Sequence, residues 1–240
     1  LKKFYNKLSF KNKSRVRKLY HLIFNRKNYQ SFTNYSISDE TNKFTHILES
    51  INYARIVSLN PVYFEFGCYS GRTFSAAINA YNFFKIKNFS AYAFDSFRGL
   101  PENEETQSSV FKPGSFSMSK INFVQEVFNN TNHRLNNQFV IEGFYEDTLN
   151  LDLQNSIDIP SVIHIDVDLY ISAKSVFRFI APLLRVGTVI LIDDWYCFKP
   201  GENKGLQKAF NEFLDLNKNI ECEHWKNYST FGRSFFVKKI

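Results

Sequence analysis

The sequence predicts one α/β domain built on a doubly wound, Rossmann-like sheet of seven strands, preceded by an N-terminal helical extension. Short apolar runs alternate with stretches of helical periodicity, which is the pattern of a parallel sheet with helices on both faces. Four of these runs also end at or beside a carboxylate, as strands do where an open sheet binds ligands at its carboxyl edge: residues 62–67, 91–95, 162–168 and 188–194.

A basic amphipathic helix is predicted near residues 15–26, because apolar residues recur there at helical spacing: Val16, Leu19, Tyr20, Ile23 and Phe24. Residues 28–40 have no such periodicity and predict a linker that ends near a helix cap at Ser38 or Asp39. A helix over about 40–58 and a strand over 62–66 follow. Next come a helix over 73–84, a strand over 91–95 and an irregular segment over 101–119, which is long enough for a lid.

The C-terminal half continues the alternation. Helices are predicted over about 119–133, 172–184 and 203–217, and strands over 138–142, 161–167 and 187–192. Two further runs, 219–226 and 233–239, predict a terminal antiparallel hairpin, which completes the set of seven strands.

The positive charge is concentrated at the N-terminus. Of the 30 Lys and Arg residues, ten precede the first acid, Asp39, which leaves 20 basic against 23 acidic side chains in the rest of the chain. We therefore divide the chain into a basic extension, 1–38, and a catalytic domain, 39–240, that is not a nucleic-acid-binding domain. The extension could dock on its own domain or on a second subunit of a homodimer, or it could contact an anionic membrane surface or a polyanionic acceptor.

Cysteine usage predicts a cytoplasmic protein. Cys68, Cys197 and Cys222 have no metal-ligand or redox spacing, which is typical of free thiols in a reducing compartment. No apolar run approaches the roughly 20 residues that span a bilayer.

The first strand leads into a glycine turn, residues 65–71 (EFGCYSG), where a nucleotide could approach the backbone. It is not the dinucleotide fingerprint, because an acid, Glu65, stands two residues before Gly67 and a third glycine is missing. An acid there is better suited to an amino-acid or sulfonium group than to a phosphate. A purely structural turn is the alternative.

Two further strand ends have features of a nucleoside site. Asp95 stands where Rossmann-like folds bind ribose hydroxyls with a carboxylate, although a turn cap would use the same position. Gly143 would permit backbone contact with a base, and the aromatic rings of Phe144 and Tyr145 could cover a purine. Core packing explains the two rings equally well.

The strongest signal is the group of aspartates after the last two parallel strands. Asp166 and Asp168 are expected to share a strand face with His164, and Asp193 and Asp194 end the neighbouring strand. Such carboxylates favour Mg²⁺ over Zn²⁺, and a neighbouring carboxylate could accept a proton from a metal-bound hydroxyl. The alternative is that these acids cap the following helices, and His164 is better explained as a core residue.

Several segments resemble the macrocin O-methyltransferase family: residues 93–102 (AFDSFRGLPE), 143–149 (GFYEDTL), 165–170 (IDVDLY) and 186–195 (VGTVILIDDW). The resemblance runs from about Tyr63 to Phe213. It implies a class I fold and a metal-dependent enzyme that transfers a methyl group from S-adenosylmethionine to sugar hydroxyls.

Position by position, the resemblance implies that Glu65, Gly67 and Ser70 or Gly71 hold the methionine part of the cofactor. Asp95 would hold the ribose, and the adenine would be surrounded by Ser96, Gly143, Phe144 and Tyr145. Mg²⁺ would bind Asp166, Asp193 and Asp194, with Asp166 or Asp168 as the catalytic group nearest the departing proton. Some relatives have Lys or His where this chain has Leu169, so the base stays open. A sugar ring could stack on Trp195, Tyr196 or Phe198.

The predicted function is therefore Mg²⁺- and S-adenosylmethionine-dependent methylation of a hydroxyl on a sugar or sugar-containing small molecule. Its partner would be a small-molecule or glycan acceptor, with no nucleic acid. One alternative keeps the cofactor but takes a catechol-like phenol as acceptor. Another is a catalytically vestigial binding protein associated with RNA or a membrane through its basic N-terminus.

Overall fold

The structure is a computed structural model that describes residues 29–102, 111–133, 139–199 and 201–240. For residues 29–38 it describes the backbone alone. The chain divides into two compact units, Leu1–Thr41 and Asn42–Ile240. In the first unit the described residues, 29–41, are helical and belong to α3 (Tyr29–Ile56), which extends into the second unit. The predicted basic helix near 15–26 lies outside the described residues.

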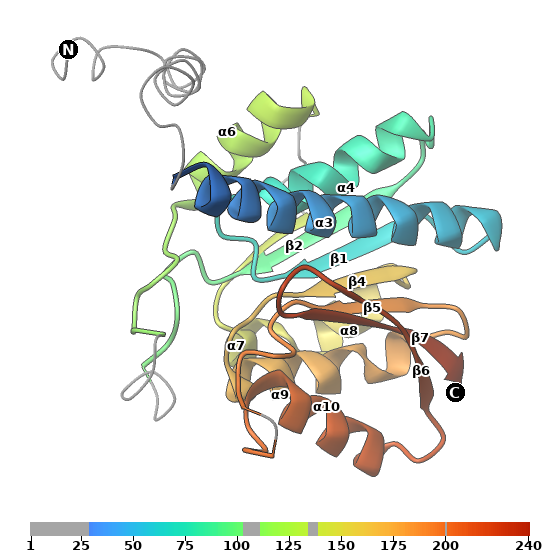
Figure 1. The fold of residues 1–240 in the computed structure, drawn as a ribbon. Coiled ribbons are helices and arrows are strands. Elements are labelled where there is room, and N and C mark those ends of the chain that lie inside the picture. The colour runs from blue at the N-terminus through green and yellow to red at the C-terminus, as the bar shows by residue number, and fades with distance from the viewer. Residues whose placement is uncertain (1–28, 103–110, 134–138, 200) are drawn as a thin grey trace, which may run out of the picture. The chain divides into compact units, whose positions relative to one another are not determined.

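The second unit contains a seven-stranded sheet in the order β3-β2-β1-β4-β5-β7-β6 (Figure 1). The first five strands are parallel to one another: β1 (Val62–Phe66), β2 (Ser90–Asp95), β3 (Val140–Glu142), β4 (Val162–Ile165) and β5 (Val189–Ile192). The hairpin of β6 (Glu221–Tyr228) and β7 (Gly232–Lys239) is antiparallel, and β7 pairs with β5. This confirms the predicted fold class.

Helices cover both faces of this sheet. One hydrophobic cluster joins the sheet to α3, to α4 (Arg72–Phe83) and to α6 (Lys120–Thr131); the other joins it to α9 (Tyr170–Ile180) and α10 (Gly205–Leu216). Figure 1 shows the two groups on opposite sides of the strands. The parallel strands β1, β4 and β5 are buried along their whole length, as expected for a sheet covered on both faces.

Two parts of the predicted secondary structure are wrong. Residues 29–40 are helical rather than a linker: α3 begins at Tyr29, and no Gly or Pro interrupts the chain from there to Ile56. Two short helices after β3, α7 (Tyr145–Thr148) and α8 (Leu151–Ser156), are missing from the prediction. Segments of four and six residues are too short to display a helical period.

The helix predicted over 172–184 is α9, which begins at Tyr170 and ends at Ile180. It is followed by η2 (Ala181–Leu183), a 3₁₀ turn that contains Pro182. No helix in the described ranges combines the length and apolar character of a membrane span.

The strand order places a topological switch between β1 and β4. From β1 the chain proceeds to β2 and β3 on one side, whereas β4 and β5 lie on the other. Open α/β sheets bind ligands in the crevice at the carboxyl ends of strands at such a point. Backbone hydrogen bonds join the segments at these strand ends. Gly67 N donates to Phe94 O (2.9 Å), and Asp166 N donates to Phe66 O (2.9 Å).

Candidate functional site

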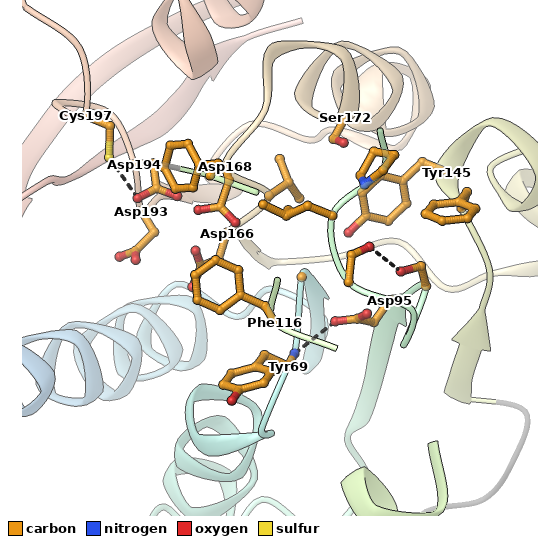
Figure 2. Close-up of a pocket in the computed structure, with 18 of the residues that line it drawn as sticks. Tyr69, Asp95, Phe116, Tyr145, Asp166, Asp168, Ser172, Asp193, Asp194 and Cys197 are labelled. Carbon is orange, nitrogen blue, oxygen red and sulfur yellow. Dashed lines mark hydrogen bonds between the residues drawn. The ribbon is translucent and has the colours of Figure 1, made fainter. Parts of the chain in front are cut away.

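A cavity of about 530 Å³ opens at the carboxyl edge of the parallel strands (Figure 2). Its wall brings together most of the predicted site residues: Gly67, Asp95, Ser96, Gly143, Phe144, Tyr145, Asp166, Asp168, Asp193 and Asp194. These residues come from the ends of five different strands. A single cavity therefore contains both the predicted nucleoside residues and the aspartates.

The glycine turn is shaped by a close approach of two backbones. Gly67 has φ 81°, and a β-carbon there would lie 1.8 Å from the backbone oxygen of Asp166. Gly71, with φ 70°, is the N-cap residue before α4 and leaves room for the Phe123 ring, which an added β-carbon would meet at 2.9 Å. Both positions require glycine for steric reasons, whether or not a ligand binds.

Asp95 organises this turn from the end of β2. Its Oδ2 accepts hydrogen bonds from the backbone N–H groups of Cys68 (2.7 Å) and Tyr69 (2.9 Å), and its Oδ1 accepts from Phe97 N (2.7 Å). The carboxylate thus has the turn-capping role that was the alternative to ribose binding. Because it also lines the cavity, its remaining lone pairs are available to a ligand.

Three predicted cofactor residues, Glu65, Ser70 and Gly71, are not part of the described cavity wall. Glu65 is fully buried and accepts hydrogen bonds from the hydroxyls of Tyr63 (2.5 Å) and Thr73 (2.9 Å). Its Oε2 also lies 3.5 Å from Nδ1 of His164, which is equally buried on the neighbouring strand. The Glu65 side chain therefore belongs to a polar cluster inside the fold rather than to the edge of the sheet.

The predicted nucleoside residues are held at one end of the cavity by local contacts. Ser96 Oγ donates to Gly99 O (3.1 Å) and accepts from Arg98 N (3.1 Å). The Arg98 guanidinium lies 5.9 Å from the centre of the Phe144 ring, and the Tyr145 hydroxyl donates to Phe94 O (3.3 Å). These contacts hold two aromatic rings beside a serine, an arrangement that can enclose a planar base.

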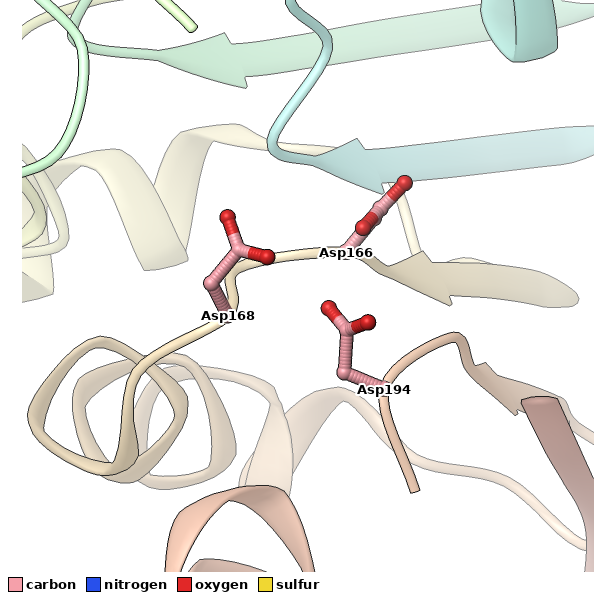
Figure 3. A group of neighbouring side chains, drawn as sticks. All are labelled: Asp166, Asp168 and Asp194. Carbon is pink, nitrogen blue, oxygen red and sulfur yellow. The ribbon is translucent and has the colours of Figure 1, made fainter. Parts of the chain in front are cut away.

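At the other end, carboxylate oxygens of Asp166, Asp168 and Asp194 lie within 4.8 Å of one another (Figure 3). Strand alternation does not bring them together, contrary to expectation, because β4 ends at Ile165 and Asp168 is in a left-handed turn with φ 58°. This turn directs Asp168 back toward Asp194. The structure thus groups Asp168, predicted as a catalytic residue, with two predicted metal ligands.

Asp193, the third predicted ligand, has a different partner. Its Oδ2 accepts a hydrogen bond from the ammonium group of Lys43 on α3. Burial acts to lower the pKa of Lys43, but the charges of Asp193 and Asp166 outweigh it and raise that pKa above its ordinary value. Lys43 was not predicted as a site residue.

Burial and crowding make three of the carboxylates, those of Asp166, Asp168 and Asp194, difficult to ionise. Burial, followed by the charges of neighbouring aspartates, raises the pKa of Asp166 well above its usual range and that of Asp168 to about 9. The pKa of Asp194 is raised for the same reasons. Among the described residues, Oδ1 of Asp193 and Oδ2 of Asp194 are buried without a hydrogen-bond partner.

A divalent cation fits this site, because it would offset the repulsion and ligate the unpartnered oxygens. Carboxylate oxygens are the ligands that hard cations such as Mg²⁺ prefer. Cys197, whose Sγ donates to Asp194 Oδ1 (3.0 Å), is the one soft ligand at the described cavity wall. Burial and the Asp194 charge raise the pKa of this thiol, which keeps it protonated beside the carboxylate.

The aromatic rings at the cavity differ from those predicted. Trp195 is buried in the core against Phe210 and Phe235, and neither Tyr196 nor Phe198 is part of the wall. Instead, three half-exposed rings line the cavity: Tyr69, Phe116 and Phe231. No sequence signal marks them, because they lie in turns and loops. Of the predicted lid, residues 103–110 lie outside the described ranges, while Pro101 and Phe111 line the cavity.

Comparisons with known proteins agree with this geometry. Residues 25–225 match the family model described as "Macrocin-O-methyltransferase (TylF)". Among solved structures, the O-methyltransferase NovP superposes with a TM-score of 0.67 at 18% identity, over 82% of this chain and 80% of that one. The calicheamicin methyltransferase CalS11 gives a TM-score of 0.64 at 17% identity, over 95% and 93%. These likenesses show the fold, and no curated protein matches the sequence.

Proposed function

Because the chain belongs to the macrocin O-methyltransferase family, we propose that it methylates a hydroxyl group of a sugar or sugar-containing small molecule, with S-adenosylmethionine as donor and Mg²⁺ in the site. The observation that carries this proposal is the single cavity that joins a nucleoside-like end to a carboxylate cluster. A transferase of this kind needs both substrates side by side, so that donor and acceptor meet in line.

For the donor, we assign the nucleoside end of the cavity. Asp95 would accept hydrogen bonds from the ribose hydroxyls, and Phe144 and Tyr145 would flank the adenine. Gly67 would allow the backbone to approach the methionine part. Since the Glu65 carboxylate is engaged with Tyr63 and Thr73, we assign it a structural role behind the turn.

For the metal, we retain Asp166, Asp193 and Asp194, because each offers a carboxylate at the same edge of the sheet and Oδ1 of Asp193 and Oδ2 of Asp194 have no hydrogen-bond partner among the described residues. When bound, Mg²⁺ would lower the pKa of a ligated hydroxyl and offset the repulsion among the carboxylates. Asp168 then remains as the proton acceptor, within 4.8 Å of the Asp166 and Asp194 oxygens.

The proposed reaction balances without a further reactant. The acceptor oxygen forms a bond to the methyl carbon while the carbon–sulfur bond of the donor breaks, so the sulfonium becomes a thioether. The hydroxyl proton passes to the Asp168 carboxylate. The chain's own contribution is to align the two substrates and to exclude water around the carboxylates.

The acceptor class is supported by the family and by one structural neighbour. CalS11 is described as a "TDP-rhamnose 3'-o-methyltransferase", and its ligand-free structure covers 95% of this chain with a TM-score of 0.59 at 18% identity. Half-exposed aromatic rings beside the carboxylates also suit the apolar face of a sugar ring.

An acceptor screen tests the proposal. Purified protein would be incubated with S-adenosylmethionine and Mg²⁺ against nucleotide sugars, glycosides and catechols, and S-adenosylhomocysteine formation would be measured. Turnover with sugars alone supports the proposal, whereas turnover with catechols alone refutes the acceptor class.

A second experiment tests Asp168 as the proton acceptor. Asp168→Asn should reduce turnover by at least about 100-fold while it retains Mn²⁺ binding. Loss of Mn²⁺ binding instead would make Asp168 a ligand.

A further inference from the structure

Lys43 is the only residue with a cationic side chain among the described residues of the cavity wall. It lies on α3, 150 residues away in sequence from Asp193, to which its ammonium group donates. Its side chain is 25% exposed and that of Asp193 is 5% exposed, so the pair is largely shielded from water. A shielded charge acts on its neighbours more strongly than a surface charge.

The Lys43 charge acts on more than one aspartate. Asp166, Asp193 and Asp194 line the same cavity as Lys43, and the charges of all three act to raise the pKa of its ammonium group. These are the three residues to which we assign the divalent cation. The Lys43 ammonium group and the proposed metal ion would therefore both interact with the same three carboxylates.

We propose that Lys43 is an internal counter-cation that competes with the divalent metal for the aspartate cluster. The inference rests on the proposed function, because it presupposes that the cluster binds a divalent metal. Without metal, Lys43 offsets part of the carboxylate repulsion and keeps the site assembled. With metal, the same charge repels the incoming ion and occupies Asp193 Oδ2, which lowers the affinity below the value that the carboxylates alone would give.

A purely structural role for Lys43 predicts the opposite change in metal affinity when the side chain is replaced. If its hydrogen bond only held Asp193 in a productive orientation, removing it would loosen a ligand and weaken metal binding. Competition predicts that removing the charge strengthens metal binding. The direction of the change in affinity therefore separates the two roles.

The experiment is a titration of metal-free protein with Mn²⁺, in which free Mn²⁺ is followed by electron paramagnetic resonance. Lys43→Met and Lys43→Gln remove the charge, and Lys43→Arg retains it. Lys120→Met is the matched control, because Lys120 is 29% exposed and lies 3.8 Å from Glu142 but is not part of the described cavity wall.

We expect the two neutral variants to bind Mn²⁺ at least about tenfold more tightly than the wild type, and the arginine variant and Lys120→Met to bind within about threefold of it. In thermal melts, the metal-free Lys43→Met protein should unfold at a lower temperature than the metal-free wild type. Added Mn²⁺ should raise its melting temperature by more than it raises that of the wild type. Equal or weaker binding in the neutral variants overturns the inference. Absence of Mn²⁺ binding in the wild type overturns instead the metal site on which it rests.

Discussion

The α-carbon of Gly67 lies against the backbone carbonyl of Asp166, so closely that a β-carbon at residue 67 would be 1.8 Å from the oxygen. This contact joins the turn after β1 to the segment after β4. It therefore fixes the distance between the proposed donor end and the aspartates, and it does so through backbone atoms that cannot move aside.

Gly67→Ala should abolish correct folding of this edge, because both the contact and the positive φ oppose a side chain. Gly114→Ala is the control: Gly114 also has a positive φ, 75°, but apart from its chain neighbours no atom of the described residues lies within 4 Å of its added β-carbon. We expect Gly114→Ala to cost about 1 kcal/mol of unfolding free energy, and Gly67→Ala at least about 3 kcal/mol. Urea denaturation measures both; equal losses would mean that the backbone around Gly67 relaxes.

Asp95→Ala should weaken S-adenosylhomocysteine binding by about 10- to 100-fold and also lower the melting temperature. The change removes the acceptor of three backbone N–H groups as well as the proposed ribose contact. Calorimetric titration measures the affinity, and Mn²⁺ binding should be preserved. Asp158→Ala, which removes a carboxylate bonded to the Tyr92 hydroxyl (2.8 Å), is the control and should leave the affinity unchanged. Unchanged affinity in Asp95→Ala would remove Asp95 from the donor site.

Acid should destabilise the protein through His46. This residue is 2% exposed and its Nε2 lies 2.8 Å from Ser234 Oγ. Burial lowers its pKa to about 4, although a hydrogen bond with Glu49 opposes the shift. Since the unfolded chain binds a proton near pH 6.5, it holds more protons than the folded chain at lower pH. The contribution of neutral His46 to the free energy of unfolding is therefore complete above about pH 6.5 and is lost as the pH falls toward 4.

Between pH 7 and 5 this group alone should remove about 2 kcal/mol of unfolding free energy. Urea denaturation at the two pH values measures the change in the wild type and in His46→Gln, which keeps a polar side chain but cannot titrate. The variant should lose correspondingly less stability on acidification. The same loss in both proteins would assign the acid sensitivity to other groups.

Phe231→Ala should raise the acceptor KM by about fivefold without changing the affinity for S-adenosylhomocysteine. Phe231 is 46% exposed and lines the cavity from the turn of the last hairpin. Loss of one aromatic contact with a sugar ring corresponds to about 1 kcal/mol. Phe83→Ala is the control, since Phe83 is 70% exposed on α4 and is not part of the cavity wall. A rise in KM for both variants would contradict a specific contact.

Much of the site is predictable because parallel strands present their carboxyl ends at one edge. Asp95, Asp166 and Asp194 line one cavity for this reason, and each is identifiable as an acid that follows an apolar run. Glu65 satisfies the same description yet points into the core. A strand that is buried along its whole length has no polar alternation from which to tell the direction of its side chains.

The missed residues depend on contacts distant in sequence. Lys43 reaches Asp193 only because α3 packs beside the end of β5, and nothing near residue 43 in the sequence indicates this partner. Phe231 reaches the cavity through the placement of β7 between β5 and β6. Local periodicity predicts elements, whereas these contacts follow from tertiary packing.

The terminal hairpin places Phe231, which lines the cavity, outside the hydrogen-bonded strands β6 and β7. Its strands are fixed by the β5–β7 and β6–β7 ladders, while residues 229–231 form only a turn, anchored where Tyr196 N donates to Phe231 O (3.1 Å). Of these three positions Phe231 lines the cavity, so a substitution there changes the cavity wall outside both ladders. A combinatorial library confined to them is therefore an economical starting point for redirecting the enzyme to new acceptors.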